Sequence, residues 1–316
     1  MLKSNFALTE AQAQTIVDRA SPGRRVARLS AFGHGEISAV FDVELTDGQP
    51  GLVIKIYPDT LHWKMQKEIL VTGLMSGCEL AAPVPRILLA DGSKSLIASN
   101  FMVMDRLPGS PLADGERGLS EQACFAAYAD MGRLLHQVHA ITLESFGYIG
   151  AAGVVKPFAS NRAYVSFQFD KKLGEFADHG GPTDLVVRLR AYVERSEPLL
   201  DACATPRLCH YDFHPGNILA ERKDDGLRLT GLIDLENAIA GDPLMDIAKT
   251  LDYSVHGVAA RRAGLLAGYG PIERPRWQDA IALYEFYGLL ELWCWWKHIG
   301  DHQRAADLIG EFARFA

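Results

Sequence analysis

The segment around Asp212 and Asn217 constrains this chain more than any other. The two residues are five positions apart, and Pro215 and Gly216 lie between them. Proline fixes its own φ angle and glycine adopts conformations that other residues avoid, so this pair forces the chain to turn. We therefore expect the Asp212 carboxylate and the Asn217 amide to face one point in space.

A hairpin is predicted directly after this turn. Residues 218–220 are extended, the Asp-Asp-Gly sequence at 224–226 is a turn, and residues 227–233 return with apolar side chains. A hairpin brings the residue after its second strand close to the residue before its first strand. Asp234 should therefore lie beside the loop that contains Asn217, despite their separation in sequence.

These polar residues suit one kind of chemistry. Phosphoryl transfer from ATP needs a carboxylate near the reacting hydroxyl and oxygen ligands for Mg²⁺. We predict that Asp212 orients the hydroxyl and accepts its proton, and that Asn217 and Asp234 bind Mg²⁺. The hypothesis is an ATP-dependent transfer of the γ-phosphoryl group to an alcohol.

A metal-dependent hydrolase is an alternative. His210, Asp212 and His214 alternate with other residues, and imidazole and carboxylate groups both bind zinc or a pair of metal ions. This interpretation gives no role to Asn217 or Asp234. The joint spacing therefore favours phosphoryl transfer.

The pattern His210-x-Asp212-x-x-x-x-Asn217 resembles the catalytic loop of the protein-kinase-like fold. The form with His214 and Pro215 resembles the branch of aminoglycoside phosphotransferases and choline kinases. For His214 the resemblance implies a contact with the γ-phosphate or a role in ordering the loop. His210 is expected to brace the loop.

The segment 233–248 resembles the metal-binding segment of the same branch, and Asp246 within it is expected to brace the catalytic loop through hydrogen bonds. The resemblance covers nearly all of the chain and implies an α+β, two-lobed, protein-kinase-like fold. Residues 1–106 would be a nucleotide-binding N-lobe, an antiparallel sheet with a helix. Residues 107–316 would be a mainly helical C-lobe with the catalytic loop, metal and acceptor site. No Ala-Pro-Glu motif follows, so a peptide acceptor is not expected.

A glycine loop precedes the second predicted strand. Gly33 and Gly35 would let backbone N–H groups approach a phosphate, whereas Ser38 replaces the third glycine of the usual kinase pattern. Such a loop between strands is also common as a plain hairpin turn. Its place before a strand with a lysine favours nucleotide binding.

Lys55 is the one charged residue in the apolar run 52–57. It resembles the lysine that holds the α- and β-phosphates in kinases. An unpaired buried charge costs several kcal/mol, so a carboxylate partner is expected. Glu68, in the predicted helix 61–74, is the candidate and resembles the kinase αC glutamate, with Glu79 as the second choice.

The hinge of the kinase-like fold is expected after the strand 99–104. Backbone groups from Asp105 to Leu107 would hold adenine, and Met104 would pack on its ring. A methionine in a strand is more often simply part of the core.

Further helices are predicted near residues 10–17 and 121–139, in two parts of 160–200, and over 277–300 and 302–315, whereas 146–156 is predicted to be loop. The late helices carry an aromatic and charged stripe, which we interpret as core, with amine binding by cation–π attraction as the alternative. Its members are Tyr284, Tyr287, Glu291, Trp295 and His298.

The chain has 316 residues and a formal charge of −7, which argues against a nucleic-acid partner and favours a neutral or cationic substrate. Its five cysteines form no Cys-x-x-Cys pair and are odd in number, as expected for reduced thiols in the cytoplasm. No segment is long and apolar enough to span a membrane.

The sequence leaves the acceptor and the nucleotide open. The acceptor could be an aminoglycoside, another antibiotic, choline, an amino alcohol or a sugar, and the nucleotide could be GTP instead of ATP. An inactive nucleotide-binding pseudokinase is a further alternative, although the complete set of Lys55, Asp212, Asn217 and Asp234 argues against it.

Overall fold

The computed structural model describes residues 6–32, 38–255 and 257–315. The chain divides into two compact units. Unit 1 comprises Met1–Asp130, Ile149–Gly153 and Pro215–Glu236, and unit 2 comprises Met131–Tyr148, Val154–His214 and Asn237–Ala316. Unit 1 is built on an antiparallel sheet and unit 2 is mainly helical, which confirms the predicted α+β class. The lobe boundary between residues 106 and 107 stays a prediction.

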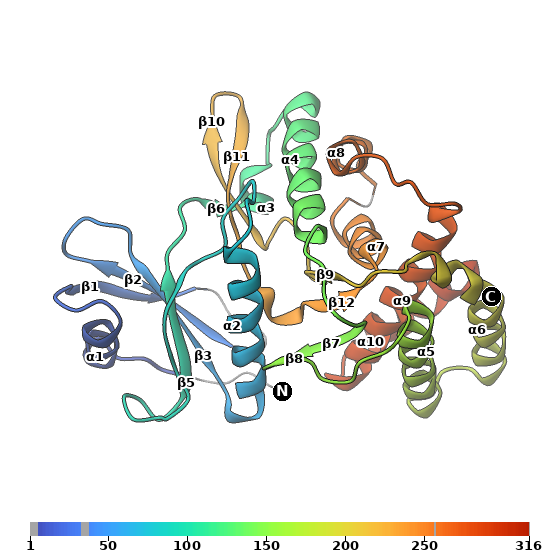
Figure 1. The fold of residues 1–316 in the computed structure, drawn as a ribbon, viewed down its shortest axis with the longest axis horizontal. Coiled ribbons are helices and arrows are strands. Elements are labelled where there is room, and N and C mark those ends of the chain that lie inside the picture. The colour runs from blue at the N-terminus through green and yellow to red at the C-terminus, as the bar shows by residue number, and fades with distance from the viewer. Residues whose placement is uncertain (1–5, 33–37, 256, 316) are drawn as a thin grey trace. The chain divides into compact units, whose positions relative to one another are not determined.

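The main sheet of unit 1 is antiparallel, with strand order β1-β2-β3-β5-β4 (Figure 1). The runs 52–57 and 99–104, predicted as strands, correspond to β3 and β5. The strand bounds are β1 (Val26–Ala31), β2 (Ala39–Leu45), β3 (Leu52–Tyr57), β4 (Ile87–Asp91) and β5 (Asn100–Asp105).

Two helices cover opposite faces of this sheet (Figure 1). The first, α1 (Glu10–Ala20), is the helix predicted near residues 10–17; it begins with a capping box of Thr9 and Gln12 and packs on the face that carries Ile54 and Ile56. The second, α2 (His62–Ser76), packs through Met65 and Ile69 on the other face. Because successive strand residues point to opposite faces, Lys55 lies on the α2 face.

A three-stranded sheet completes unit 1, in the order β11-β10-β6. The predicted hairpin is confirmed, with β10 (Ile218–Lys223) paired to β11 (Gly226–Leu232). Asp224 in the turn has a positive φ of 53°, a conformation that aspartate tolerates better than most residues. The short elements β6 (Ser110–Pro111) and α3 (Leu112–Gly115) pack beside the hairpin.

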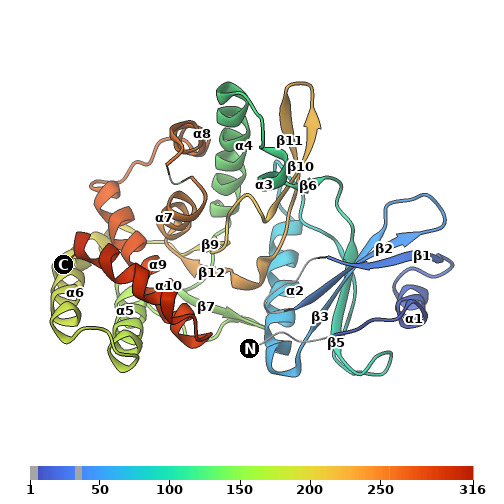
Figure 2. The same cartoon turned by 180° about the vertical axis from the view of Figure 1, so that it is seen from behind.

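Helix α4 (Glu121–His139) begins in unit 1 and ends in unit 2. Unit 2 then consists largely of helices (Figure 2), and α9 packs against α5, α7 and α10. The bounds are α5 (Asn161–Asp178), α6 (Thr183–Ser196), α7 (Pro243–Ser254), α8 (Ala259–Tyr269), α9 (Trp277–His298) and α10 (His302–Leu308), with 3-10 turns η2 (Glu197–Ala202) and η4 (Ile309–Arg314).

Two further features of the fold were not predicted. Residues 146–156 are not a plain loop, because they contain β7 (Gly147–Gly150) and β8 (Gly153–Val154), which join β9 (Arg207–Cys209) and β12 (Ile239–Gly241) in a small sheet. These strands are too short to show a period-two pattern in sequence. Helix α8 also went unrecognised. Its close approach to α4 requires Gly132, since a Cβ there would lie 2.1 Å from the Leu265 carbonyl oxygen.

The core interpretation of the stripe on α9 holds for Tyr284 and Tyr287, which are buried. Glu291 and Trp295 are only half-buried. His298, in contrast, is exposed, so the core interpretation is wrong for that residue.

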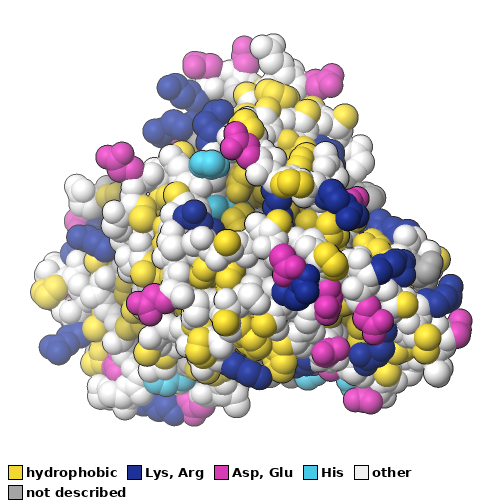
Figure 3. Space-filling model, turned by 45° about the vertical axis from the view of Figure 1, so that its right-hand side comes forward, with side chains coloured by type: hydrophobic (Ala, Val, Ile, Leu, Met, Phe, Trp, Pro, Cys, Tyr) yellow, Lys and Arg dark blue, Asp and Glu magenta, His cyan; other side chains and the backbone are white. Residues whose placement is uncertain are grey.

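No described helix is both long and apolar enough to cross a membrane. On the face drawn in Figure 3, basic and acidic side chains are interspersed with apolar ones, and neither sign of charge gathers into one large patch.

Candidate active site

Lys55 stands at the centre of a buried charge cluster in unit 1. Its Nζ atom lies 2.8 Å from Glu68 Oε2, 2.8 Å from Asp234 Oδ1 and 3.1 Å from Glu236 Oε2. The predicted ion pair of Lys55 and Glu68 is therefore present. Glu236 was missed in the sequence, although it follows Asp234 by only two residues.

Local structure explains why these groups meet. Lys55 projects from β3 toward α2, and Glu68 lies one helical turn after Lys64 on that helix. Asp234 directly follows β11 and has a positive φ of 64°, which is rare for a residue with a side chain. Glu236 belongs to the 3-10 turn η3 (Leu235–Asn237) that comes next. The strained turn thus delivers two carboxylates to one lysine.

The cluster shifts the protonation equilibria of its members. Burial alone would lower the pKa of Lys55, but attraction to Asp234 and Glu68 raises it well above its ordinary value. Burial raises the pKa of Glu68, and the ammonium group of Lys55 opposes that rise. The Tyr57 hydroxyl donates a hydrogen bond to Glu68. Lys55 is therefore charged and held from several sides.

The hairpin places Asn217 beside the strand that leads to Asp234. The Asn217 carbonyl oxygen accepts a 3.0 Å hydrogen bond from the Ile233 amide, and Ile218 pairs with Leu232. The predicted proximity of the 217 and 234 positions is thus found. The side chains offer an amide oxygen and a carboxylate, the donor types that suit Mg²⁺, and their role as metal ligands stays a prediction.

The structure describes only some of the other residues that were expected to contact the nucleotide. Gly33 and Gly35 lie outside the described residues, whereas Ser38 is buried next to β2. Met104 packs in the core with Tyr57, Met65 and Met102.

The hinge carries ordered polar contacts. At the end of β5, Asp105 forms a 3.0 Å ion pair with Arg86. The next backbone amide, of Arg106, donates to the Gly51 carbonyl. Leu107 is half-buried. Adenine binding by this segment stays a prediction.

Residues 210–214 of the predicted catalytic loop lie in unit 2, whereas Asn217 belongs to unit 1. Asp212 Oδ2 accepts a 3.2 Å hydrogen bond from Asn237 Nδ2, and the Asp212 backbone amide donates to His210 Nδ1 at 3.2 Å. His214 Nε2 lies 3.8 Å from Asp212 Oδ1. Asn237 was not recognised in the sequence, because its contact with Asp212 spans 25 residues. The carboxylate of Asp212 is thus oriented by an amide.

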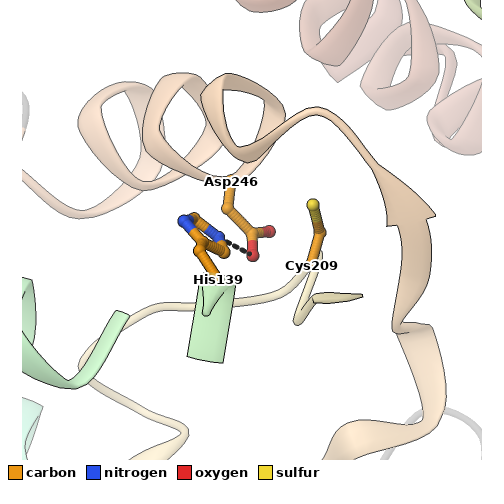
Figure 4. Close-up of side chains that lie close together, drawn as sticks. All are labelled: His139, Cys209 and Asp246. Atoms are coloured by element: carbon orange, nitrogen blue, oxygen red, sulfur yellow. Dashed lines mark hydrogen bonds and ion pairs between the residues drawn. The ribbon is translucent and has the colours of Figure 1, made fainter. Parts of the chain in front are cut away.

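Asp246 braces the loop, as expected from the sequence. Its Oδ2 accepts from the His210 amide and its Oδ1 from the Tyr211 amide, each at 2.6 Å. His139 Nε2 lies 3.1 Å from Oδ2, a contact marked by the dashed line in Figure 4. The neighbouring Cys209 thiol has a pKa raised well above its usual value by burial.

Neither this cluster nor the proposed hydrolase site has the character of a metal centre. Both oxygens of Asp246 already accept hydrogen bonds from backbone amides, and His139 Nε2 lies 3.1 Å from one of them. Within the described ranges, the ligand atoms of His210, Asp212 and His214 do not all three lie within 4.8 Å of one another. The hydrolase alternative therefore has no geometric support.

A second network holds the start of α7, the helix that carries Asp246. Asp242 accepts from the Leu244 amide at 3.0 Å and caps the helix. The same carboxylate pairs with Arg274 at 2.5 Å and accepts from the Tyr284 hydroxyl at 2.8 Å. This network fixes α7, and α7 in turn fixes the catalytic loop.

Tyr211, just before Asp212, has a positive φ of 63°. Its hydroxyl donates a 2.6 Å hydrogen bond to Glu291 on α9, and Lys249 Nζ lies 4.1 Å from its ring centre. Lys249 is also 4.0 Å from Glu291. The residue before the predicted base is therefore held at both its backbone and its side chain.

Residues 28–280 match the model of the phosphotransferase enzyme family. No curated protein sequence matches the chain.

Solved structures share the fold. A thermostable mutant of aminoglycoside phosphotransferase APH(4)-Ia, in ternary complex with ADP and hygromycin B, has 18% identity and a TM-score of 0.74 and covers 97% of this chain and 98% of its own. The GDP and kanamycin complex of APH(2")-IIia has 15% identity and a TM-score of 0.69, with 96% and 97% covered. At these identities the likeness establishes the fold. Because the family model spans most of the sequence, the chain belongs to the phosphotransferase enzyme family and has its two-lobed, protein-kinase-like fold.

Proposed function

We propose that this chain transfers the γ-phosphoryl group of ATP to a hydroxyl group of a small molecule, with an aminoglycoside-like compound as the favoured acceptor. The observation that carries the proposal is the position of Lys55, 2.8 Å from both Glu68 and Asp234. A lysine held this way, beside a carboxylate suited to Mg²⁺, is the arrangement that phosphoryl transfer uses. The neighbours solved with ADP and with GDP support a nucleotide substrate, with GTP as the alternative.

In this proposal the residues of unit 1 handle the nucleotide. Lys55 holds the phosphates and Glu68 sets its position, while the loop at Gly33, Gly35 and Ser38 covers them. Asn217 and Asp234 would hold Mg²⁺, which neutralises charge on the phosphates when bound. We assign adenine to the segment Met104–Leu107. The N-lobe would end at residue 106.

Asp212 orients the acceptor hydroxyl and accepts its proton. The Asn237 amide fixes the orientation of its carboxylate, and the Asp246 brace fixes the backbone before it. Most of the rate enhancement would come from positioning of this kind. His214 orders the loop or contacts the γ-phosphate.

The acceptor would be a small hydroxyl compound. Neighbours solved with hygromycin B and with kanamycin support an aminoglycoside-like molecule. We place the enzyme in the cytoplasm, where ATP is plentiful and the five cysteines, all free, stay reduced.

The decisive experiment measures release of ADP from Mg·ATP and of GDP from Mg·GTP in the presence of aminoglycosides, choline, amino alcohols and sugars. Asp212→Asn should lower acceptor-dependent turnover by about 10²-fold or more while nucleotide binding persists. Asp252→Asn on α7, whose side chain lies 4.0 Å from Arg314, is the matched control and should keep activity. An Asp212→Asn enzyme with full turnover would refute the assignment, and a chain that binds no nucleotide would refute the proposed function itself.

A further inference from the structure

Glu236 is shared between two lysines. One carboxylate oxygen, Oε2, lies 3.1 Å from Lys55 Nζ, and the other, Oε1, lies 3.1 Å from Lys64 Nζ. All three side chains are buried, with 3% of Glu236 and 8% of Lys64 exposed. No sequence motif had singled out either Glu236 or Lys64 for a role in nucleotide binding.

The charges around Lys55 are unfavourable for an anionic ligand. Three carboxylates, those of Glu68, Asp234 and Glu236, contact the single ammonium group of Lys55. Phosphate groups that approach Lys55 must compete with these carboxylates for its charge and are repelled by them. In a buried setting such repulsion is only weakly screened.

Lys64 changes this balance. It places a second positive charge on the far oxygen of Glu236, so the carboxylate is shared and its pull on Lys55 is reduced. Lys64 and Glu68 are four residues apart on α2 and therefore lie on one face of the helix. Helix α2 thus supplies both the partner of Lys55 and the cation that neutralises the competing carboxylate.

We infer that Lys64 is a positioning residue for nucleotide binding. Its ion pair with Glu236 weakens the attraction of this carboxylate for Lys55, so that Lys55 remains available to phosphate groups. This inference rests on the proposed function, because it assumes that Lys55 binds a nucleotide. Lys64 acts through Glu236 and not by touching the nucleotide.

The test is a double-mutant cycle in which nucleotide affinity is measured, so no acceptor substrate is needed. The dissociation constant of AMP-PNP with Mg²⁺ is measured by calorimetry for the wild type, Lys64→Gln, Glu236→Gln and the double variant. Lys64→Gln should weaken binding by about tenfold, which corresponds to about 1.4 kcal/mol. For Glu236→Gln the dissociation constant of AMP-PNP should be no more than about threefold above that of the wild type. The double variant should bind as tightly as Glu236→Gln.

Two controls accompany the cycle. Lys64→Arg keeps the charge and should bind AMP-PNP as the wild type does. Lys94→Gln breaks the exposed ion pair with Asp59, which measures 2.7 Å in the same unit, and should leave binding unchanged. Circular dichroism establishes that each variant is folded at the temperature of the titration. If Lys64→Gln alone does not fold, Glu236→Gln is compared with the double variant.

A general structural role would weaken binding in both single variants, with no recovery in the double variant, and this result would overturn the inference. Unchanged binding by Lys64→Gln would also overturn it, as would a further loss when Lys64→Gln is added to Glu236→Gln. A wild type that does not bind AMP-PNP would refute the proposed function first. The failures of the two proposals are therefore distinguishable.

Discussion

The Oδ1 atom of Asp246 accepts a 2.6 Å hydrogen bond from the backbone amide of Tyr211, the residue before Asp212. The second oxygen of the same carboxylate accepts from the His210 amide at the same distance. Two consecutive amides of the catalytic loop are thus tied to one buried side chain on α7. Their positions follow the position of that helix.

We expect Asp246→Asn to lower kcat by about 10²-fold, because a displacement of the loop misaligns Asp212. The variant replaces one acceptor oxygen by an NH₂ group that faces an amide donor, which should cost about 2 kcal/mol of stability. Steady-state kinetics and urea unfolding measure the two effects. The control is Asp252→Asn, on the same helix, and equal kinetics in the two variants would contradict the brace.

The positive φ of Tyr211 leads to a second prediction. A residue with a Cβ pays about 1 kcal/mol for this left-handed conformation, and glycine does not. Tyr211→Ala and Tyr211→Gly both lose the hydrogen bond to Glu291, so they differ mainly in backbone strain. Tyr211→Gly should therefore be the more stable variant by about 1 kcal/mol in urea unfolding. A more stable alanine variant would show that the strain is relieved by other means.

Lys55→Met should remove the central cation from three carboxylates. Loss of one partner from a buried charge cluster costs about 3–5 kcal/mol, so the thermal midpoint should fall sharply at neutral pH. Nucleotide binding should fall with it. Lys94→Met, which removes an exposed lysine from an ion pair, is the matched control and should change stability by less than about 1 kcal/mol. Comparable losses in both variants would argue against the cluster.

The lowered pKa of Lys67 leads us to expect that the free energy of unfolding depends on pH. Burial, with repulsion from Lys64, lowers its pKa to about 7 in the folded chain, whereas an unfolded lysine titrates near 10.4. Between these values the unfolded chain binds more protons, so stability should rise with pH by up to roughly 1 kcal/mol per unit. The penalty is greatest below about pH 7 and vanishes above about pH 10.4.

Lys67→Met should flatten this pH dependence and stabilise the protein most at the lower end of the window. Urea unfolding of the variant and the wild type at about pH 7 and about pH 9.5 measures the difference in slope. Lys94→Met should retain the wild-type slope. Parallel slopes for the wild type and Lys67→Met would assign the pH dependence to other groups.

Short-range patterns were sufficient for much of the fold and part of the site. The apolar run 52–57 identified the strand that carries Lys55, and helical periodicity placed Glu68 in the helix that follows it. The turn at 224–226 returned Asp234 toward Asn217. In each case the contact depends on one element, or on two elements joined by a tight turn, whose geometry is set by local residues.

Other contacts could not be predicted in this way. Lys64 and Glu236 are 172 residues apart, and His139 and Asp246 are 107 apart. No periodicity relates such positions, because their distance depends on how α2 and α7 pack against distant segments. The small sheet that contains β7 and β12 escaped notice for a related reason, since strands of three or four residues carry no distinctive pattern.

The amino-acid sequence by itself determined which residues could carry phosphoryl transfer, since Lys55, Asp212, Asn217 and Asp234 stand in motifs whose spacing is local. Only the tertiary structure decided how those residues are held: Glu236 is shared between two lysines, Asn237 donates to Asp212, and His139 contacts the Asp246 carboxylate. The physical reason is that a buried charge must find its partners wherever packing places them, and packing joins segments that are far apart along the chain.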